Sequence, residues 1–452
     1  MNDKVKNVLK YVSRYLIILI IALCAFLAVT LIPTRYIEKS VISSVNSQLE
    51  SRYKVQILNK CVVFDTYTDA LMLSTAYSLD NKNPFESMLA CRSNYISGYT
   101  TDVSLDVFEG ENVLNERFDI LSFENLLRGH LVKSYEYARY WQGYLTILKP
   151  LMITFDYHSI ILINYIVNYL LIFYFIYLMH KKGIKKSYIF AIIISFIAID
   201  GLVIFSCLEE SITVTIMLIS TIYLLEKDTK NIYKYMMTVG ILTSFFEWLT
   251  TPIFTYILPV LIYIILRKKE NASLKEIVKI VIKTGVFWCI GYLTMWASKW
   301  VIVDMFYNKG LIRTALREAM YRTDVLYYSP ITVILSNFGF LGFIVAFYFI
   351  AILLINGVYT IYYKIRYKKL DERLKYNLLF TLLSFIPVVW QIIFTTHSFT
   401  HAYFVYRDYY ITILFAQMIL LNLLSKFKNK KIVYSIYTII TIVIIILNYI
   451  II

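Results

Sequence analysis

The chain has 452 residues, 59% of them hydrophobic, and a mean hydropathy of +0.63. A soluble domain cannot bury that much apolar surface, which excludes the soluble globular class and predicts a polytopic membrane protein. The formal net charge is +15, but Lys and Arg lie mainly in short connections between apolar runs, as on the inner side of membrane proteins. We therefore expect a lipid bilayer, and no nucleic acid, as a partner.

The first predicted span covers residues 15–32 and follows a basic N-terminus. It lacks a small-residue cleavage site and ends at Pro33, which favours a retained span over a signal peptide. The preceding positive charge places the N-terminus on the cytoplasmic side of the cell membrane. Residues 1–33 form the first of three predicted parts of the chain.

Residues 34–158 form the second part, a polar segment with too many charged and turn-forming residues to lie in lipid. It follows the first span and is therefore expected to be extracytoplasmic. Residues 68–79 are predicted to form a helix and 81–84 a turn. Asp65 and Asp69 are four residues apart, so that on a helix both carboxylates share one face.

The third part, residues 159–452, is predicted to contain ten further spans. With the first span this makes about eleven, each near the crossing length of ~20 residues. The sequence thus predicts an all-α polytopic membrane protein with a long, partly helical outer loop after the first span. The ten expected spans are 159–179, 187–206, 210–225, 235–249, 252–266, 280–303, 330–358, 376–395, 408–424 and 432–451.

The positions of the basic residues agree with this arrangement of spans, because they lie in every second connection, on the side of the N-terminus. The basic connections lie at 181–186, 227–234, 267–269, 364–375 and 426–431.

The remaining connections and span ends face outward and hold many charged and histidine residues. A membrane protein carries few such groups at this depth unless they face a cavity. The outward-facing set comprises Asp65, Asp69, Arg139, Trp141, Glu209, Glu210, Glu247, Arg313, Arg317, Arg322, Asp324, His397, His401, Arg407 and Asp408.

The order of these features resembles the GT-C superfold of integral membrane glycosyltransferases. It comprises a retained first span, an outer loop that opens with an acidic helix and ends in an aromatic stretch, and many further spans. Residues 140–151, 245–252, 295–300 and 397–401 are also similar to a group of uncharacterised bacterial membrane proteins. The resemblance implies a polyprenyl-phosphate-linked sugar donor and an extracytoplasmic glycan, lipid or protein acceptor, with inversion at the sugar carbon.

The residue types suit such a transfer. In the GT-C superfold the base is commonly an acidic residue of the first outer loop, which implies Asp69 or Asp65 as the catalytic residue. No Asp-x-Asp or Asp-Glu pair follows the first span, so both stay candidates, and a divalent cation (Mg or Mn) is a possible cofactor. Arginine binds phosphate oxygens through a planar fork, and aromatic faces suit sugar rings. The expected substrate-binding residues are Arg139, Trp141, Glu247, Arg317, Arg322, His397, His401 and Arg407.

Structural roles compete with these assignments. Asp69 suits a helix start, where the macrodipole favours a carboxylate. Glu247 precedes a proline-marked break and either caps the next apolar segment or faces substrate, alone or with a cation. His397 and His401 lack a third metal ligand of known spacing, and we expect sugar or phosphate contact rather than zinc.

Three buried or interfacial charges have a structural alternative of their own. Arg317 and Arg322 either bind phosphate or reach lipid headgroups, with Glu318 as a neutralising neighbour. Asp200 lies in an apolar run and needs a partner, for which Lys299 is the candidate.

Two other functions are open. An envelope polysaccharide polymerase or ligase has a similar number of spans, but usually carries its large outer loop late in the chain. A flippase or transporter of lipid-linked sugars predicts mid-bilayer charges and internal repeats; only Asp200 is a clear deep acid, and no half-to-half repeat is evident.

Overall fold

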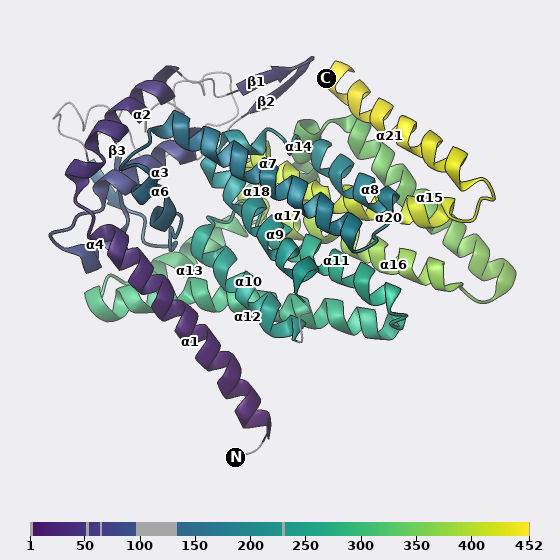
Figure 1. Ribbon diagram of the computed structural model, residues 1–452, viewed down its shortest axis with the longest axis horizontal. Coiled ribbons are helices and arrows are strands. Elements are labelled where there is room, and N and C mark those ends of the chain that lie inside the picture. Colours follow the sequence, from purple (N-terminus) through teal and green to yellow (C-terminus); the bar gives the residue numbers. More distant parts are fainter. Residues whose placement is uncertain (1–2, 51–53, 64–65, 96–132, 228–230, 452) are drawn as a thin grey trace.

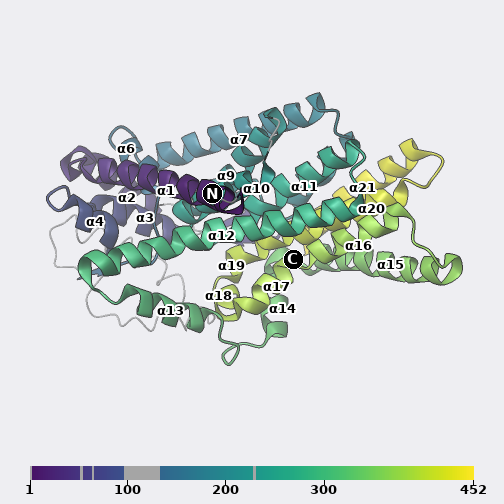
Figure 2. The ribbon, with the colours of Figure 1, turned by 90° about the horizontal axis from the view of Figure 1, so that it is seen from below.

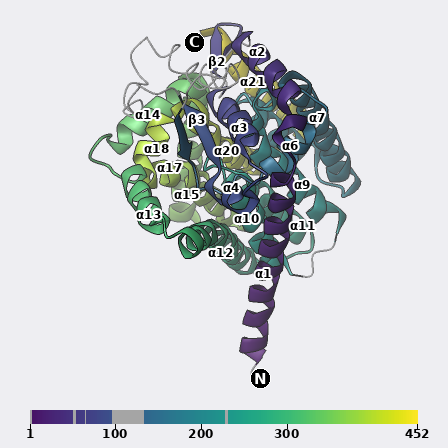
Figure 3. The same ribbon diagram turned by 90° about the vertical axis from the view of Figure 1, so that its left-hand side faces the viewer.

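The computed structural model describes residues 3–50, 54–63, 66–95, 133–227 and 231–451. These residues form an elongated helical bundle, with α1 inclined away from it (Figures 1 and 3). Within this part of the chain, eight helical segments are long and apolar enough to cross a membrane. This confirms an all-α membrane protein. They comprise α1 (Asp3–Thr30), α7 (Tyr157–Lys181), α9 (Leu208–Glu226), α12 (Leu274–Tyr307), α15 (Phe343–Tyr367), α16 with α17 (Glu372–Ser384 and Ile386–Ile393), α19 to α20 (Ala402–Val405, η5 Tyr406–Tyr409 and Tyr410–Leu424) and α21 (Lys430–Ile451).

Shorter helices complete the bundle. At 1.5 Å per residue, the 12 residues of α8 extend about 18 Å, less than the ~30 Å hydrocarbon core. The chain then passes through η4 before α9 begins. The shorter helices are α8 (Lys186–Ile197), η4 (Ile204–Ser206), α10 (Ile232–Phe246), α11 (Phe254–Lys269), α13 (Leu311–Arg322), α14 (Pro330–Leu341) and α18 (Thr395–Thr400).

The segment after α1 covers one end of the bundle, whereas the α15–α16 and α20–α21 connections lie at the other end (Figure 2). The segment after α1 contains two antiparallel strand pairs, in which Lys54 lies opposite Val63 and Arg92 opposite Glu136. The predicted helix at 68–79 corresponds to α3, which begins two residues earlier and ends at Ser78, and the predicted turn at 81–84 corresponds to a bend over residues 81–83 that leads into α4. The elements of this segment are η1 (Thr34–Tyr36), α2 (Glu38–Glu50), β1 (Lys54–Ile57), β2 (Lys60–Val63), α3 (Thr66–Ser78), α4 (Pro84–Ala90), β3 (Arg92–Tyr95), β4 (Lys133–Glu136) and α6 (Leu145–Leu151).

The expected span at 330–358 is divided at Gly342, which separates α14 from α15. Gly342 has a φ of 99°, a conformation that disfavours other residues. Asn448 of α21 occupies the break: its amide donates to the Leu341 carbonyl at 2.9 Å, and its oxygen accepts from Val345 N–H at 3.3 Å. The hydropathy pattern does not reveal this break, because both halves are apolar.

Asp200 is paired, as its buried position requires, but not with Lys299. Its carboxylate lies 2.7 Å from Lys60 Nζ at the start of β2 and accepts from Tyr406 and Tyr449. Lys299 instead donates to the Met88 carbonyl at 2.9 Å. The prediction that Lys299 pairs with Asp200 is therefore wrong, because the partner, Lys60, comes from a strand far away in the sequence.

Helices α10 and α12 approach each other closely through two glycines. A Cβ on Gly240 would lie 2.1 Å from the Trp288 carbonyl oxygen, and one on Gly291 2.1 Å from that of Met237. Small residues allow this approach in membrane helices. The contact matters for the site, because α10 leads into Glu247.

We predict that Gly291→Ala destabilises the protein by about 1–3 kcal/mol, because the added methyl group forces α10 and α12 apart. Thermal unfolding of the purified protein in detergent measures this effect. Gly357→Ala in α15 is the matched control, since a Cβ there meets nothing within 4 Å. Equal unfolding temperatures for the two variants would contradict the prediction.

Candidate functional site

Two arginines from distant segments share one carboxylate at the end of the bundle that carries the segment after α1. Glu318 of α13 lies 2.7 Å from Arg139 Nη1 through Oε2 and 3.1 Å from Arg322 Nε through Oε1. The spacing of Glu318 and Arg322 is one helical turn, which brings both side chains to the same face. With two guanidinium groups and one carboxylate, these three side chains together carry a net positive charge.

His397 joins Arg322 to the loop that follows α10. Arg322 Nη1 lies 2.8 Å from His397 Nδ1, and His397 Nε2 lies 3.1 Å from the Leu249 carbonyl oxygen. Arginine only donates, so Nδ1 must accept and the proton must lie on Nε2. His397 is therefore a neutral ring in one fixed tautomer.

Aromatic side chains of α12 complete a closed set of contacts. The Trp296 and Trp300 indoles donate to the Arg139 carbonyl at 2.9 and 3.0 Å. Trp296 packs against Tyr292, whose hydroxyl donates to Glu247 Oε2 at 3.1 Å. Glu247 leads back through the chain to Leu249 and hence to His397.

We call this set the outer polar cluster. It consists of Arg139, Glu247, Tyr292, Trp296, Glu318, Arg322 and His397.

The backbone conformation after α10 positions Glu247 beside the other residues of the cluster. Helix α10 ends at Phe246, and Glu247 continues in an extended conformation. Two residues later Leu249 has a φ of 73°, a left-handed conformation that is unusual for a branched residue. This sharp change of direction leaves the Leu249 carbonyl free to accept from His397.

Burial disfavours the charged form of several titratable side chains at this site. It raises the pKa of Glu247 to about 8, against the lowering effect of the Leu249 and Thr250 amides and the Tyr292 hydroxyl. One oxygen of Glu247, Oε1, has no hydrogen-bond partner among the described residues. Burial and the positive charges of the region lower the pKa of His397 well below its usual value and that of His401 to about 3.

Asp69 occupies a different position, at the start of α9. Its carboxylate accepts from the Leu208 amide at 3.0 Å, the Glu209 amide at 3.2 Å and the Tyr157 hydroxyl at 2.6 Å. The side chain is fully buried. Asp69 thus caps a helix N-terminus, which is a structural role.

A second buried pair lies close to this cap. Arg407 Nη1 contacts Glu210 Oε1 at 2.7 Å, and both side chains are almost fully buried. The neighbouring Asp408 is fully buried, and neither of its carboxylate oxygens has a partner among the described residues.

The structure therefore brings together Arg139, Glu247, Arg322 and His397, and the His401 ring lies 4.8 Å from that of His397. Trp141 is fully buried instead and donates to the Met295 carbonyl at 2.6 Å. Arg317 is exposed on α13.

Asp65 lies outside the described residues. Sequence reasoning treated Glu318 only as a neighbour of the arginines and missed Tyr292 and Trp296. The spacing of four between Glu318 and Arg322 was the available signal for the ion pair. Nothing in the sequence indicated that Arg139 reaches the same carboxylate.

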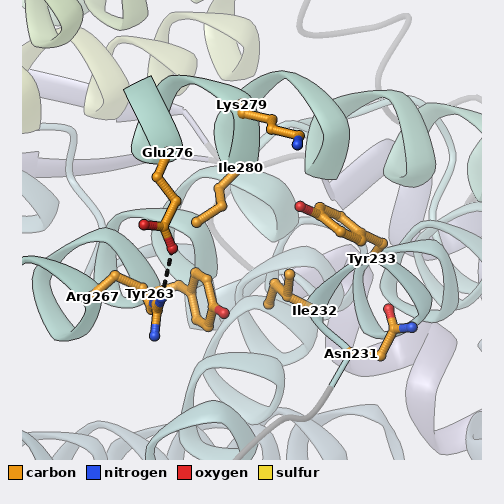
Figure 4. Close-up of a pocket in the computed structure, with 8 residues that line it drawn as sticks. All are labelled: Asn231, Ile232, Tyr233, Tyr263, Arg267, Glu276, Lys279 and Ile280. Atoms are coloured by element: carbon orange, nitrogen blue, oxygen red, sulfur yellow. Dashed lines mark hydrogen bonds and ion pairs between the residues drawn. The ribbon is translucent and has the colours of Figure 1, made fainter. Parts of the chain in front are cut away.

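A cavity of about 300 Å³ lies elsewhere, among the ends of α10, α11 and α12 at the basic connections (Figure 4). It includes Tyr233, Tyr263 and Arg267, and Arg267 pairs with Glu276 at 2.6 Å. None of the predicted site residues lines this cavity. Among the described residues, no group of three or more His, Cys, Asp or Glu is arranged to hold a metal ion.

Comparison with protein family models, with curated protein sequences and with solved structures finds no match to this chain. The functional argument therefore rests on the geometry of the site.

We predict that His397 contributes a loss of stability as the pH falls from 7.5 to 5.5, opposite in sign to the contribution of Glu247, whose raised pKa favours the folded state at lower pH. The folded state keeps His397 neutral, whereas the unfolded chain binds protons near the usual histidine pKa of about 6.5, which costs up to about 1.4 kcal/mol per pH unit and histidine. His397→Gln should reduce this loss, because glutamine can accept from Arg322 and donate to Leu249 without titrating.

Unfolding temperatures across the pH range measure the effect. His158→Gln, at an exposed histidine, is the control. The interpretation fails if both variants keep the full pH dependence of the wild type.

Proposed function

We propose that the protein is an integral membrane glycosyltransferase of GT-C type. It moves a sugar from a polyprenyl-phosphate-linked donor to an acceptor hydroxyl on the outer side of the membrane. The observation that supports this most is the outer polar cluster. There, Arg139 and Arg322 share Glu318 beside the buried carboxyl group of Glu247.

The cluster suits a donor with a phosphate at the membrane edge. A lipid phosphate is anionic, and the leaving polyprenyl phosphate gains further negative charge as the sugar departs. Two arginines held at one site stabilise that charge without rearranging. Tyr140 and Trp296 stack on each other nearby, with ring centroids 5.7 Å apart, and give the cluster an apolar wall.

The contacts favour Glu247 over Asp69 as the general base. Both acids accept from two backbone amides and a hydroxyl, and such bonds stabilise the charged form. Glu247 differs in having one oxygen, Oε1, without a partner among the described residues and a pKa near 8, in the range where proton transfer is efficient at neutral pH. Asp69 would then hold the start of α9 in place, and Asp65 stays an untested candidate.

The proposed reaction is a single displacement. The acceptor oxygen attacks the anomeric carbon while the bond from that carbon to the phosphate oxygen breaks. Glu247 takes the acceptor proton, and polyprenyl phosphate leaves with the bonding electrons, beside Arg139 and Arg322. Attack opposite the leaving group inverts the sugar carbon.

The membrane arrangement completes the proposal. The shorter helices α8, α10 and α11 supplement the eight long segments to give eleven crossings. The N-terminus and the lysine-rich connections are then cytoplasmic, and residues 34–158 are extracytoplasmic. The acceptor is an extracytoplasmic glycan, lipid or protein, and a divalent cation stays a possible cofactor.

The test uses the full-length protein in nanodiscs, with a panel of radiolabelled polyprenyl-phosphate hexoses as donors. We expect donor cleavage or transfer by the wild type. Arg322→Gln should lower it by about 10²–10³-fold, because the leaving phosphate loses a positioned donor. Glu247→Gln should lower it by at least about 10²-fold through loss of the base.

Arg313→Gln, in an exposed arginine of the same helix, is the matched control and should keep wild-type turnover. Asp69→Asn separates the two candidate bases, provided its unfolding temperature is measured in parallel. Vesicle assays that show the lipid-linked sugar crossing the bilayer uncleaved would instead indicate a flippase. Turnover that survives both Arg322→Gln and Glu247→Gln would remove the proposed site.

A further inference from the structure

The lysine-rich end of the bundle holds a cavity that sugar transfer does not use. It has a volume of about 640 Å³ and opens between the α15–α16 and α20–α21 connections. Helices α15 and α21 run side by side at this end of the molecule (Figures 1 and 2). The lining includes Asp371, Arg373, Lys426, Phe427, Lys428 and Lys430.

The charge of this lining is strongly unbalanced. Four cationic side chains face one carboxylate, and Asp371 is already engaged. Its Oδ1 accepts from the Leu374 amide at 2.8 Å, and its Oδ2 lies 3.4 Å from Arg373 and 3.6 Å from Lys426. The ammonium groups of Lys428 and Lys430 form no ion pair within the described part of the chain. The cavity therefore has uncompensated positive charge.

One cation is held in place. Lys426 donates to the Tyr359 hydroxyl at 2.8 Å and lies 4.9 Å from the centres of the Tyr359 and Tyr363 rings. These contacts hold its ammonium group at the lining of the cavity. An ordered cation next to two unpaired lysines is a better anion site than mobile surface lysines alone.

Apolar surface adjoins the charge. Phe427, which lines the cavity, is 57% exposed although it stands between two lysines. A ligand with an anionic head and apolar chains would contact both the lysines and this ring. A free anion would leave Phe427 uncovered.

The cavity of Figure 4 lies at the same end and differs in charge. Its Arg267 is paired with both Glu276 and Glu270. No comparable excess of positive charge remains there, although Lys279 is also in the lining.

We propose that the cavity between the α15–α16 and α20–α21 connections binds the phosphate headgroup of an anionic phospholipid. The lipid belongs to the leaflet at the lysine-rich end, with its chains along α15 and α21. Basic sites next to transmembrane helices recognise anionic headgroups in this way. The inference is independent of the proposed enzymatic reaction.

The test is a native mass spectrometry titration of the purified protein with phosphatidylglycerol and with phosphatidylcholine. Lys428→Gln/Lys430→Gln should weaken phosphatidylglycerol binding by about tenfold or more. Lys428→Arg/Lys430→Arg should retain it. Lys182→Gln/Lys186→Gln, which removes the same charge from another basic connection, should have no effect.

Three outcomes would overturn the proposal. Equal losses in the two glutamine variants would show general attraction to a basic face. Equal binding of phosphatidylcholine would show that charge is not recognised. Displacement of the lipid by an equal concentration of glycerol phosphate would show a site for free phosphate. Retained binding in the arginine variant, with loss in its glutamine counterpart, would support the proposal.

Discussion

The candidate site depends on one bridging carboxylate. Glu318 contacts both Arg139, from the segment before α6, and Arg322, from its own helix. Two guanidinium groups held at one place repel each other unless a carboxylate lies between them, and one carboxylate leaves a positive charge available to a ligand. Because Arg322 also contacts His397, the same interaction ties α13 to the late helices. The long first segment, α13 and α18 thus become one unit.

Four buried carboxylates fall into two groups. In one group both oxygens accept hydrogen bonds, and in the other at least one oxygen has no partner among the described residues. Asp69 and Asp200 accept from several donors each, and both join elements that are distant in the sequence. Glu247 and Asp408 are as deeply buried, yet have oxygens without a partner within the described residues. Buried polar groups are expensive to leave unsatisfied unless a ligand, water or proton completes them. Completeness of bonding therefore separates structural acids from functional candidates better than burial does.

Much of the fold follows from the sequence, because hydropathy and the alternation of basic connections depend on local composition. The helix at 68–79 and the long apolar helices are confirmed on that basis. Helix breaks such as that at Gly342 depend on Asn448, more than 100 residues away. The partners of buried charges are similarly remote: Asp200 pairs with Lys60 rather than Lys299. Charge and approximate depth are visible in a sequence, whereas the identity of the partner is a property of the packing.

Cationic side chains are arranged differently at the two ends of the bundle. At the end that carries the segment after α1, the arginines are ordered by one carboxylate, a histidine and indoles, so their positions are fixed before a ligand arrives. At the other end Lys428 and Lys430 form no ion pair with any described residue, whereas Lys426 is ordered by aromatic contacts. Fixed cations favour recognition of a defined charge at a defined place, which chemistry requires. Flexible cations suit headgroups that exchange with the bilayer. Under the two proposals, ordered arginines would bind one reacting phosphate at one end, and flexible lysines would bind exchanging lipid headgroups at the other.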